Sequence, residues 1–376
     1  MFLPRKIYPA FRDKIQTNLI TGLLGMKRTG KTVLVKQALK EISNKNSLYL
    51  ALKRPDNREI FEHSNYDAIR QIFINRGLTL DRPMVIALDD AELLPNLAKV
   101  IGYLTEHHQI KFVLIGSRAD SLAGLVAKPF ELRPLDWGEW LEFKGIPALT
   151  ADWRRGNFNS GDYDRLAVFY EEYISFGGFP QVVLAGAEAD KQELLLEIIA
   201  ALEFSKEKKL YSLVKLLAGA AGERLEISQL SRLSGWSRPT VTDYLKRLEN
   251  SYLIKTVPVY TSGGEQEIVK AKKLYFSDTG LVNTLAELSG EAQFKNTVYN
   301  QLSGLDKWQY YALKTGQEID FVSDKRLGIG IRETPTRQDF NSLVRLAKKA
   351  KITKIRLIGR QPSPQFNDYT WGGEIV

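Results

Sequence analysis

The sequence predicts an α/β fold: a parallel β-sheet covered by helices, then a helical region, and then a second α/β region. Three observations predict it. Apolar runs of strand length alternate with helical patterns over residues 19–116, a glycine-rich loop joins the first run to a helix, and the chain has 376 residues. At about 150 residues per domain, this length alone suggests two or three domains. The order of the motifs divides the chain further, into four domains.

The composition limits the classes of protein to which the chain can belong. Hydrophobic residues make up 44% and charged residues 26%, as in folded globular domains rather than disordered chains. The absence of cysteine excludes a disulfide framework, a zinc ribbon, an iron–sulfur cluster and a thiol nucleophile. No apolar run approaches the length of a membrane span, and the first residues do not form a secretory signal, so we expect a cytoplasmic protein.

The first element that carries chemistry is a glycine-rich loop. Residues 25–32 read Gly-Met-Lys-Arg-Thr-Gly-Lys-Thr and fit the P-loop pattern GxxxxGK[ST], between an apolar run and a helical pattern that begins at Val33. Backbone N–H groups of such a loop bind phosphate oxygens, the Lys31 ammonium reaches the β- and γ-phosphates, and the Thr32 hydroxyl can bind Mg²⁺. We therefore predict a site for ATP and Mg²⁺ formed by Gly25, Lys27, Arg28, Thr29, Gly30, Lys31 and Thr32.

A site of this kind needs a second strand that ends in an acid. The apolar run at residues 84–88 is followed by Asp89 and Asp90. We predict that Asp89 holds Mg²⁺ and that Asp90 orients the attacking water, with Glu92 on the helix side as a second candidate. Asp90 is one methylene shorter than the glutamate usual at this place, which allows hydrolysis but favours a low rate.

A third apolar run, residues 112–115, ends at Gly116 and Ser117. The polar residue at the end of this strand is expected to lie between the P-loop and the acidic strand, so it would face the bound phosphates. We predict that Ser117 senses the γ-phosphate.

The middle of the chain carries motifs in a recognisable order. Residues 121–126 read Ser-Leu-Ala-Gly-Leu-Val, residues 130–141 contain Pro-Leu-Asp-Trp-Gly-Glu-Trp, and residues 177–180 read Gly-Gly-Phe-Pro. Over about residues 10–335 the chain resembles the AAA-type ATPases of archaea and bacteria that join a P-loop domain, through a small helical lid, to a C-terminal domain of unknown function. Leu125 stands where that family usually has arginine.

The resemblance implies that the Gly-Gly-Phe-Pro turn lies near the nucleotide base, which adds Gly178 and Pro180 to the predicted nucleotide site. The residues also allow a plainer interpretation, a helix stop in which glycine caps one helix and proline opens the next. Both interpretations can hold together.

Residues 205–280 predict a winged helix. A helical pattern at 210–217 and a second at 227–233 precede a Ser-Gly-Trp turn and a helix that Ser237 opens. Two strand-like runs follow, 253–260 and 268–276, around a glycine-containing turn at 261–264 that would form the wing. On the last helix, Val241, Tyr244, Leu245 and Leu248 are expected to face the core, and the opposite face is basic. The predicted DNA contacts are Arg238, Thr240, Lys246 and Arg247 on that helix and Lys272 and Lys273 on the returning strand. The alternative is a packing or protein-interaction module.

The region from residue 281 resembles, in that family, a restriction-endonuclease-like domain of the PD-(D/E)xK kind. Residues 318–321, Glu-Ile-Asp-Phe, keep the acidic strand, but Lys295 stands in place of a glutamate, and Gly330 and Arg332 replace the Glu and Lys of the Glu-x-Lys pair. An arginine stays protonated and cannot serve as the catalytic lysine. We therefore predict no nuclease activity, with Asp320 as a remnant or a structural carboxylate.

The net charge of +9 permits a polyanionic partner. Outside the first 130 residues, the basic excess lies in 205–280 and in the tail, where the stretch 345–360 predicts a helix and then a strand. This basic stretch is either a second DNA contact or a solvated face.

The sequence thus predicts an AAA-type ATPase domain at 1–150, a helical lid at 151–204, a winged helix at 205–280 and a degenerate nuclease-like domain at 281–376. The function that fits all four is a DNA-binding ATPase whose nucleotide state is coupled to its grip on duplex or branched DNA, and which self-associates as a ring. The alternatives are a slow ATP-dependent switch that controls a protein partner and, less favoured, an ATP-dependent nuclease.

Overall fold

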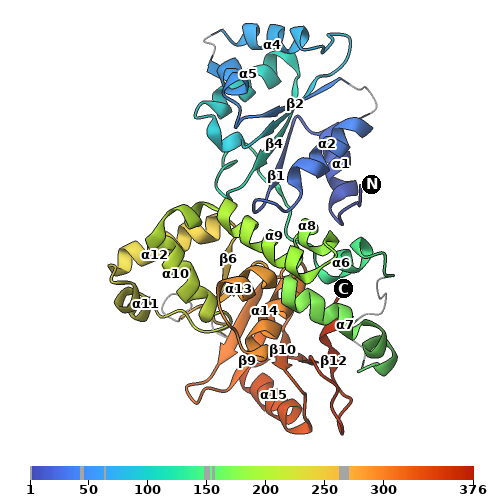
Figure 1. Ribbon diagram of the computed structural model, residues 1–376, viewed down its shortest axis with the longest axis vertical. Coiled ribbons are helices and arrows are strands. Elements are labelled where there is room, and N and C mark those ends of the chain that lie inside the picture. The colour runs from blue at the N-terminus through green and yellow to red at the C-terminus, as the bar shows by residue number, and fades with distance from the viewer. Residues whose placement is uncertain (1, 43–45, 63–64, 148–152, 155–156, 262–270) are drawn as a thin grey trace. The chain divides into compact units, whose positions relative to one another are not determined.

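The computed structural model describes residues 2–42, 46–62, 65–147, 153–154, 157–261 and 271–376. The chain divides into two compact units (Figure 1). The first unit consists of residues 1–133 with 250–252, and the second of residues 134–249 with 253–376. Each unit has its own central sheet.

The first unit is built on a five-stranded parallel sheet. Its strands follow the order β2-β3-β4-β1-β5, and every neighbouring pair is parallel. The apolar runs predicted as strands form β1, β3 and β4, so a parallel α/β core is confirmed. The strands are β1 (Ile20–Leu24), β2 (Ser47–Ala51), β3 (Val85–Asp89), β4 (Lys111–Gly116) and β5 (Phe130–Glu131).

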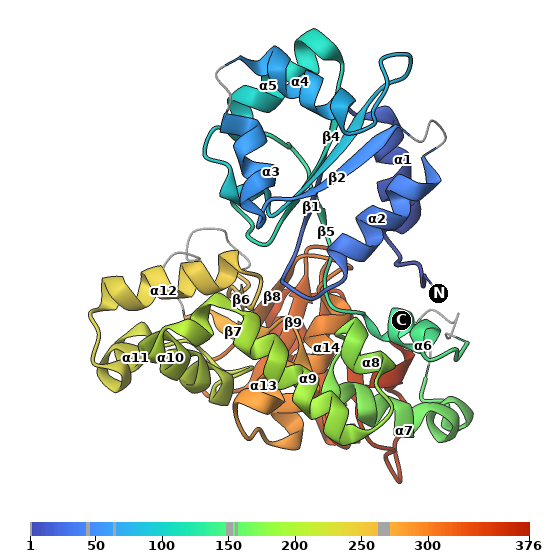
Figure 2. The ribbon, with the colours of Figure 1, turned by 45° about the horizontal axis from the view of Figure 1, so that its top comes forward.

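Helices cover both faces of this sheet. Figure 2 shows α1 and α2 on one side and α3, α4 and α5 on the other. On the α1 and α2 side, Phe11 and Leu34 pack on the strand residues Val113 and Ile115. The helices are α1 (Tyr8–Thr17), α2 (Lys31–Glu41), α3 (Pro55–Glu59), α4 (Tyr66–Asn75) and α5 (Leu97–His108), with the short 3₁₀ turns η1 (Ile60–Glu62) and η2 (Ala91–Leu93).

The second unit begins with helices and an antiparallel hairpin. Strands β6 and β7 pair directly after α12, and residues 262–270, which contain most of the predicted wing and Lys270, lie outside the described residues. The elements are α6 (Trp137–Phe143), α7 (Ser160–Phe176), α8 (Pro180–Leu184), α9 (Glu188–Ala201), η3 (Glu203–Lys206), α10 (Lys208–Gly219), α11 (Ile227–Ser234), α12 (Arg238–Asn250), β6 (Ile254–Val257) and β7 (Lys273–Phe276).

The second unit ends in a five-stranded mixed sheet of order β12-β11-β10-β9-β8, in which β8, β9 and β10 are antiparallel and β10, β11 and β12 are parallel. The basic stretch 345–360 forms the end of α15 and then β11, as expected. The elements are α13 (Thr279–Leu285), α14 (Gly290–Leu302), β8 (Trp308–Ala312), β9 (Glu318–Ser323), β10 (Leu327–Arg332), α15 (Arg337–Ala350), β11 (Lys354–Gly359), β12 (Thr370–Trp371) and η4 (Gly372–Glu374).

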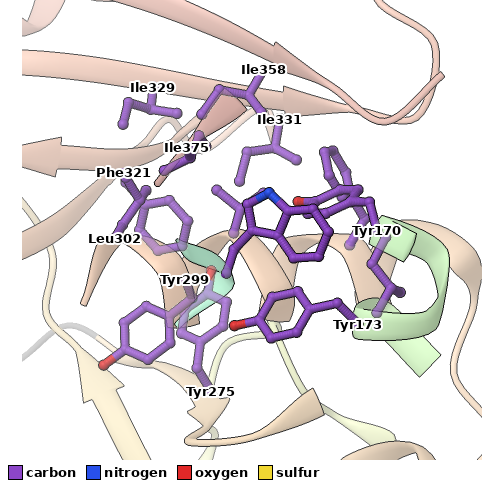
Figure 3. Close-up of a cluster of buried hydrophobic side chains, with 14 of the residues drawn as sticks. Tyr170, Tyr173, Tyr275, Tyr299, Leu302, Phe321, Ile329, Ile331, Ile358 and Ile375 are labelled. Atoms are coloured by element: carbon purple, nitrogen blue, oxygen red, sulfur yellow. The ribbon is translucent and has the colours of Figure 1, made fainter. Parts of the chain in front are cut away.

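One aromatic core joins this sheet to the helices that precede it. Tyr170 and Tyr173 of α7 belong to one buried cluster with Phe321 of β9 and Ile331 of β10 (Figure 3), and Trp137 of α6 belongs to the same cluster. Helix α15 covers the other side, where Leu343 and Leu346 pack with Ile319 and Val322. Helices α6 and α7 therefore share a core with the C-terminal sheet. Removing a buried aromatic side chain from such a core costs about 3–5 kcal/mol.

Candidate nucleotide site

The P-loop leaves β1 at Leu24 and enters α2 at Lys31. Gly25 has φ +153°, and a Cβ there would come within 2.1 Å of the Leu132 carbonyl oxygen, so only glycine fits. Gly30 has φ +98° and caps the N-terminus of α2, where a left-handed conformation again favours glycine. Both glycines of the motif are thus required by the path of the backbone.

The Lys31 side chain is buried inside this loop. Its ammonium donates hydrogen bonds to the carbonyl oxygens of Gly25 and Met26, both at 2.8 Å. Burial lowers the pKa of Lys31 to about 8, and the negative charges of Asp89, Glu92 and Asp90 oppose that shift. The ammonium is therefore desolvated and held by neutral carbonyl groups, in position to gain from an anion.

Two further side chains support the loop. The Thr29 hydroxyl is buried and donates to the Met26 carbonyl at 3.0 Å. The Arg5 guanidinium donates to the carbonyls of Thr29 at 3.1 Å and of Arg133 at 2.8 Å. Arg5 lies outside every motif, so its contact with the P-loop could not be anticipated from the sequence. The side chains of Lys27 and Arg28 are more exposed than that of Thr29, and their role in nucleotide binding stays a prediction.

The two residues predicted to hold Mg²⁺ lie in contact. Thr32 Oγ1, in the first turn of α2, donates to Asp89 Oδ2 at the end of β3 over 2.6 Å. The Tyr49 hydroxyl of β2 donates to the same carboxylate oxygen, and burial raises the pKa of Tyr49. Hydroxyl and carboxylate oxygens are the ligands that Mg²⁺ takes, so these residues fit that ion.

The acids that follow Asp89 point in different directions. Asp90 has φ +60°, and its carboxylate pairs with Lys53 at 3.3 Å, just beyond β2. Burial is the main cause that raises the pKa of Asp90. Glu92 Oε1 instead accepts hydrogen bonds from the Ser117 N–H at 3.1 Å and from Ser117 Oγ at 2.6 Å, at the end of β4. The candidate sensor Ser117 therefore holds a carboxylate in this structure.

The Gly-Gly-Phe-Pro turn has a structural role in the second unit. Gly177 ends α7 with φ +72°, and Pro180 is the first residue of α8, as a helix stop requires. The Gly178 N–H donates to Asp278 Oδ2 at 2.7 Å, and its carbonyl accepts the Leu135 N–H at 2.7 Å. These bonds confirm the helix stop, and the predicted place of Gly178 near the nucleotide stays a prediction. The predicted role of Pro180 stays a prediction.

Helix α12 carries most of the predicted DNA contacts. Val241, Leu245 and Leu248 are buried, while Arg238, Lys246 and Arg247 are exposed. Arg247 also pairs with Glu207 at 3.7 Å. Thr240 bonds the Ser237 hydroxyl at the start of the helix.

The two lysines predicted to bind DNA at the start of β7 differ in exposure. Lys272 is exposed, whereas Lys273 is buried, and its ammonium pairs with Glu318. The structure corrects the prediction for Lys273, because a buried and neutralised ammonium cannot reach a DNA phosphate.

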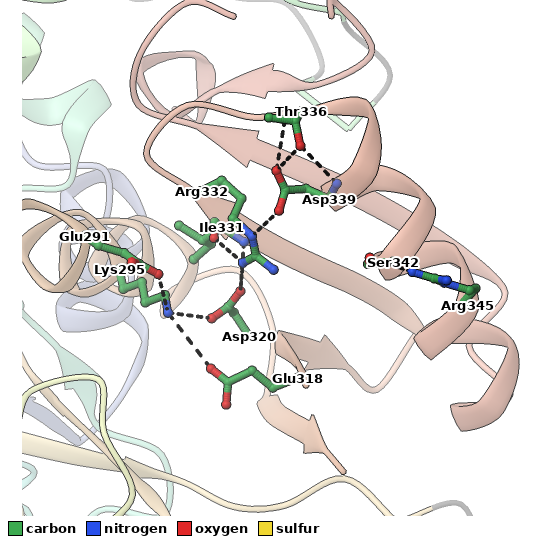
Figure 4. Close-up of polar contacts among 10 residues, drawn as sticks. All are labelled: Glu291, Lys295, Glu318, Asp320, Ile331, Arg332, Thr336, Asp339, Ser342 and Arg345. Carbon is green, nitrogen blue, oxygen red and sulfur yellow. Dashed lines mark hydrogen bonds and ion pairs between the residues drawn. The ribbon is translucent and has the colours of Figure 1, made fainter. Parts of the chain in front are cut away.

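A compact group of charges lies on the C-terminal sheet (Figure 4). The Lys295 ammonium is 2.9 Å from Glu291, 3.4 Å from Asp320 and 4.0 Å from Glu318. The buried Asp320 also accepts the Ile331 N–H at 2.8 Å and faces the Arg332 guanidinium at 3.5 Å. Lysine and arginine side chains thus surround the acidic strand. Within the described ranges, no group of three or more histidines and carboxylates is arranged to hold a metal ion.

Two family models match the chain. Residues 17–141 match the model of an AAA domain, and residues 169–292 match a domain of unknown function, DUF8612. The first match covers the parallel sheet, the P-loop and the Thr32–Asp89 pair. Residues 17–141 are thus similar to an AAA domain and carry its P-loop. Such domains bind a nucleotide, usually with Mg²⁺.

The chain is also similar to individual proteins. An uncharacterised protein of Haemophilus influenzae is 25% identical over 342 residues, which are 84% of this chain and 81% of that protein. An uncharacterised protein of Methanocaldococcus jannaschii is 21% identical over 377 residues, 92% of this chain and 82% of that protein. A solved Walker-type ATPase of Pyrococcus abyssi is 14% identical with a TM-score of 0.48 and covers 76% of this chain and 96% of its own.

A search of the helices for a membrane span gave a negative result. In the part of the chain that the structure describes, no helix is both long enough and apolar enough to cross a bilayer.

Proposed function

We propose that this protein binds ATP with Mg²⁺ at the P-loop, hydrolyses it, and couples its nucleotide state to DNA binding by the second unit. The observation that carries the ATPase part is the contact between Thr32 and Asp89 beside the buried Lys31 ammonium. Lys31 and Thr32 are consecutive in α2, and Asp89 comes from the end of β3, so two separate segments converge where the P-loop would hold the β- and γ-phosphates.

Each residue has a distinct role in this proposal. The backbone N–H groups of residues 25–31 bind phosphate oxygens, and the Lys31 ammonium exchanges a carbonyl contact for a phosphate oxygen. Thr32 and Asp89 hold Mg²⁺, which supplies positive charge to the β- and γ-phosphates when it is bound. Tyr49 orients the Asp89 carboxylate through its hydrogen bond.

The DNA part of the proposal rests on α10, α11, α12 and the β6–β7 hairpin. Three helices followed by an antiparallel hairpin are the elements of a winged helix, which supports that interpretation of residues 205–280. The exposed face of α12 presents the cations of Arg238 and Lys246, which suit contacts to DNA phosphates. Lys272 on the returning strand adds a further exposed cation.

The C-terminal sheet enters this proposal as a binding element without nuclease activity. Its buried carboxylate, Asp320, faces Lys295 and Arg332, so a metal ion would compete with two resident cations. Incubation of the protein with linear and branched DNA in Mg²⁺ or Mn²⁺ tests this part. We expect intact DNA, and cleavage that Asp320→Ala abolishes would contradict it.

The decisive experiment measures ATP hydrolysis with and without DNA. We expect Mg²⁺-dependent hydrolysis that duplex or branched DNA stimulates and that Lys31→Ala abolishes. A size measurement with and without ATP, made on the same samples, tests whether the protein self-associates as a ring.

Two results would change the proposal. If DNA binds but leaves the rate unchanged, coupling is wrong and the alternative of a slow nucleotide-dependent switch for a protein partner is favoured. If no DNA structure binds even at low salt, the DNA part is wrong.

A further inference from the structure

We propose that Glu92 is the carboxylate that orients and deprotonates the attacking water, and that Ser117 positions it. The sequence pattern favours Asp90 for this role, because Asp90 directly follows the acid that holds Mg²⁺. The inference rests on the ATPase activity proposed above and assigns one step of it to a residue.

The strand order shows which side of β3 leads toward the P-loop strand. Strand β4 lies between β3, which carries the acids, and β1, which leads into the P-loop. A carboxylate that follows β3 and lies over the end of β4 is therefore on the side of the sheet that leads to the P-loop strand. Strand β2 lies on the opposite side of β3.

The Asp90 carboxylate extends toward β2, away from the P-loop strand β1. Its positive φ turns the chain at the end of β3, and its carboxylate pairs with Lys53, two residues beyond the end of β2. The ion pair therefore holds the Asp90 charge on the β2 side of the sheet.

Glu92 extends toward the P-loop. Ser117, the residue directly after β4, fixes Oε1 of Glu92 with two hydrogen bonds. The second oxygen, Oε2, is buried and makes no hydrogen bond to any described residue. A Cβ built on Gly116 would lie 3.3 Å from this oxygen and 2.9 Å from Leu24 Cδ2. Leu24 is the last residue of β1, so Oε2 lies at the end of β4 beside the start of the P-loop.

The two oxygens of Glu92 have separate tasks in this reaction. Oε1 is held by Ser117, and Oε2 accepts the proton of the attacking water. The water oxygen forms a bond to the γ-phosphorus as the bond from that phosphorus to the β,γ-bridging oxygen breaks, and the electron pair of the broken bond leaves on ADP. The products are ADP and inorganic phosphate, and Glu92 returns its proton to solvent. Ser117 is a positioning residue because it acts through Glu92.

The test compares three variants by steady-state ATPase kinetics and by calorimetric titration with ATP and Mg²⁺. We expect Glu92→Gln to lower kcat about 100-fold or more, the usual size of a general-base contribution, while ATP affinity stays within about threefold. Ser117→Ala lowers kcat about tenfold at an unchanged KM, because binding does not need the fixed carboxylate. Asp90→Asn lowers kcat less than about fivefold. Glu106→Gln, an exposed glutamate on α5, is the matched control and leaves both constants unchanged.

Several outcomes would overturn the assignment. They are a Glu92→Gln variant with kcat within about threefold of the wild type, an Asp90→Asn variant that loses as much as Glu92→Gln, and a Glu92→Gln variant that no longer binds ATP. If Glu92→Gln does not fold, Glu92→Asp withdraws the carboxylate by one methylene and carries the same expectation. A wild-type protein without ATPase activity would instead refute the proposed function, and this inference with it.

Discussion

Two lysines, the buried Lys31 of the first compact unit and the partly buried Lys295 of the second, lie beside carboxylates at a sheet. The Lys31 ammonium is bonded to two neutral carbonyl oxygens, and burial lowers its pKa to about 8. Burial also acts to lower the pKa of Lys295, but the charges of Asp320 and Glu291 outweigh it and raise that pKa above its usual value.

The different surroundings of the two ammonium groups determine whether each can bind an anionic ligand. A desolvated ammonium held only by dipoles gains strongly from an anionic ligand, so Lys31 is prepared to bind phosphate. An ammonium that already faces three carboxylates has little left to gain, so Lys295 stabilises the fold. The same side chain thus belongs to a binding site in one unit and to a structural ion cluster in the other.

The largest expected effect tests the Lys31 half of this comparison. Lys31→Ala should weaken the binding of ATP with Mg²⁺ by at least about 100-fold, about 3 kcal/mol, because it removes the one ammonium buried in the P-loop next to the phosphates. Isothermal titration measures the affinity. Lys40→Ala, an exposed lysine on the same helix, is the matched control. Equal affinities for Lys31→Ala and wild type would remove the distinction between the two lysines.

The next effect tests the Lys295 half. Lys295→Met should lower the free energy of unfolding by about 3 kcal/mol at pH 7, because it leaves Asp320 buried with less compensating charge. Urea unfolding measures this value, and the double variant with Asp320→Asn should recover part of the loss. Lys325→Met, which removes an exposed lysine from a 3.9 Å pair with Asp306, should cost less than about 0.5 kcal/mol. A loss as small for Lys295→Met would show that the cluster adds nothing to stability.

Two carboxylates, Glu374 and Asp320, show the same contrast between burial without and burial with neighbouring cations. Burial raises the pKa of Glu374 from 4.5 to about 7, whereas Lys295 and Lys273 help to hold the pKa of the buried Asp320 below its usual value despite its own burial. A raised acid pKa favours the protonated folded state, so stability falls as the pH rises from about 4.5 to about 7. Glu374→Gln should reduce the loss of unfolding free energy between pH 5 and pH 8 by about 2 kcal/mol. Unfolding curves at the two pH values that shift in parallel for wild type and variant would contradict this.

Exposed lysines give the smallest expected effect. Lys246→Ala should weaken DNA binding by about fivefold and reduce the slope of log affinity against log salt by about one, the value of one lost phosphate contact. Fluorescence anisotropy with duplex DNA at several salt concentrations measures both. Lys99→Ala on α5, an exposed lysine outside the second unit, is the control. If both variants bind alike, α12 is not the DNA-binding face.

The parts of the site that lie within one short stretch could be predicted from the sequence. The spacing of the P-loop glycines, Lys31 and Thr32 is set by local backbone geometry, and continuous apolar runs predict buried parallel strands. The sequence offered Glu92 only as a second candidate beside Asp90. The contributions of Arg5 and Tyr49 could not be predicted, because their partners lie 24 to 128 residues away along the chain.

The error at Lys273 has a different cause. Neighbouring side chains on a strand point to opposite faces, so only one of Lys272 and Lys273 can reach solvent. The pattern of β7 already contained this constraint, and counting both lysines as one basic edge ignored it. At the Gly-Gly-Phe-Pro turn the helix-stop interpretation is confirmed, and the place of Gly178 near the nucleotide stays a prediction.

The Arg5 side chain connects the P-loop to the end of the first unit. Its guanidinium joins the carbonyl of Thr29, inside the P-loop, to the carbonyl of Arg133, the last residue of the first unit before the chain passes into the second. Tension along the chain at Arg133 is therefore transmitted to the P-loop through two hydrogen bonds, without passing through the sheet. A shift of the P-loop on phosphate binding would displace the start of the connecting segment by the same route.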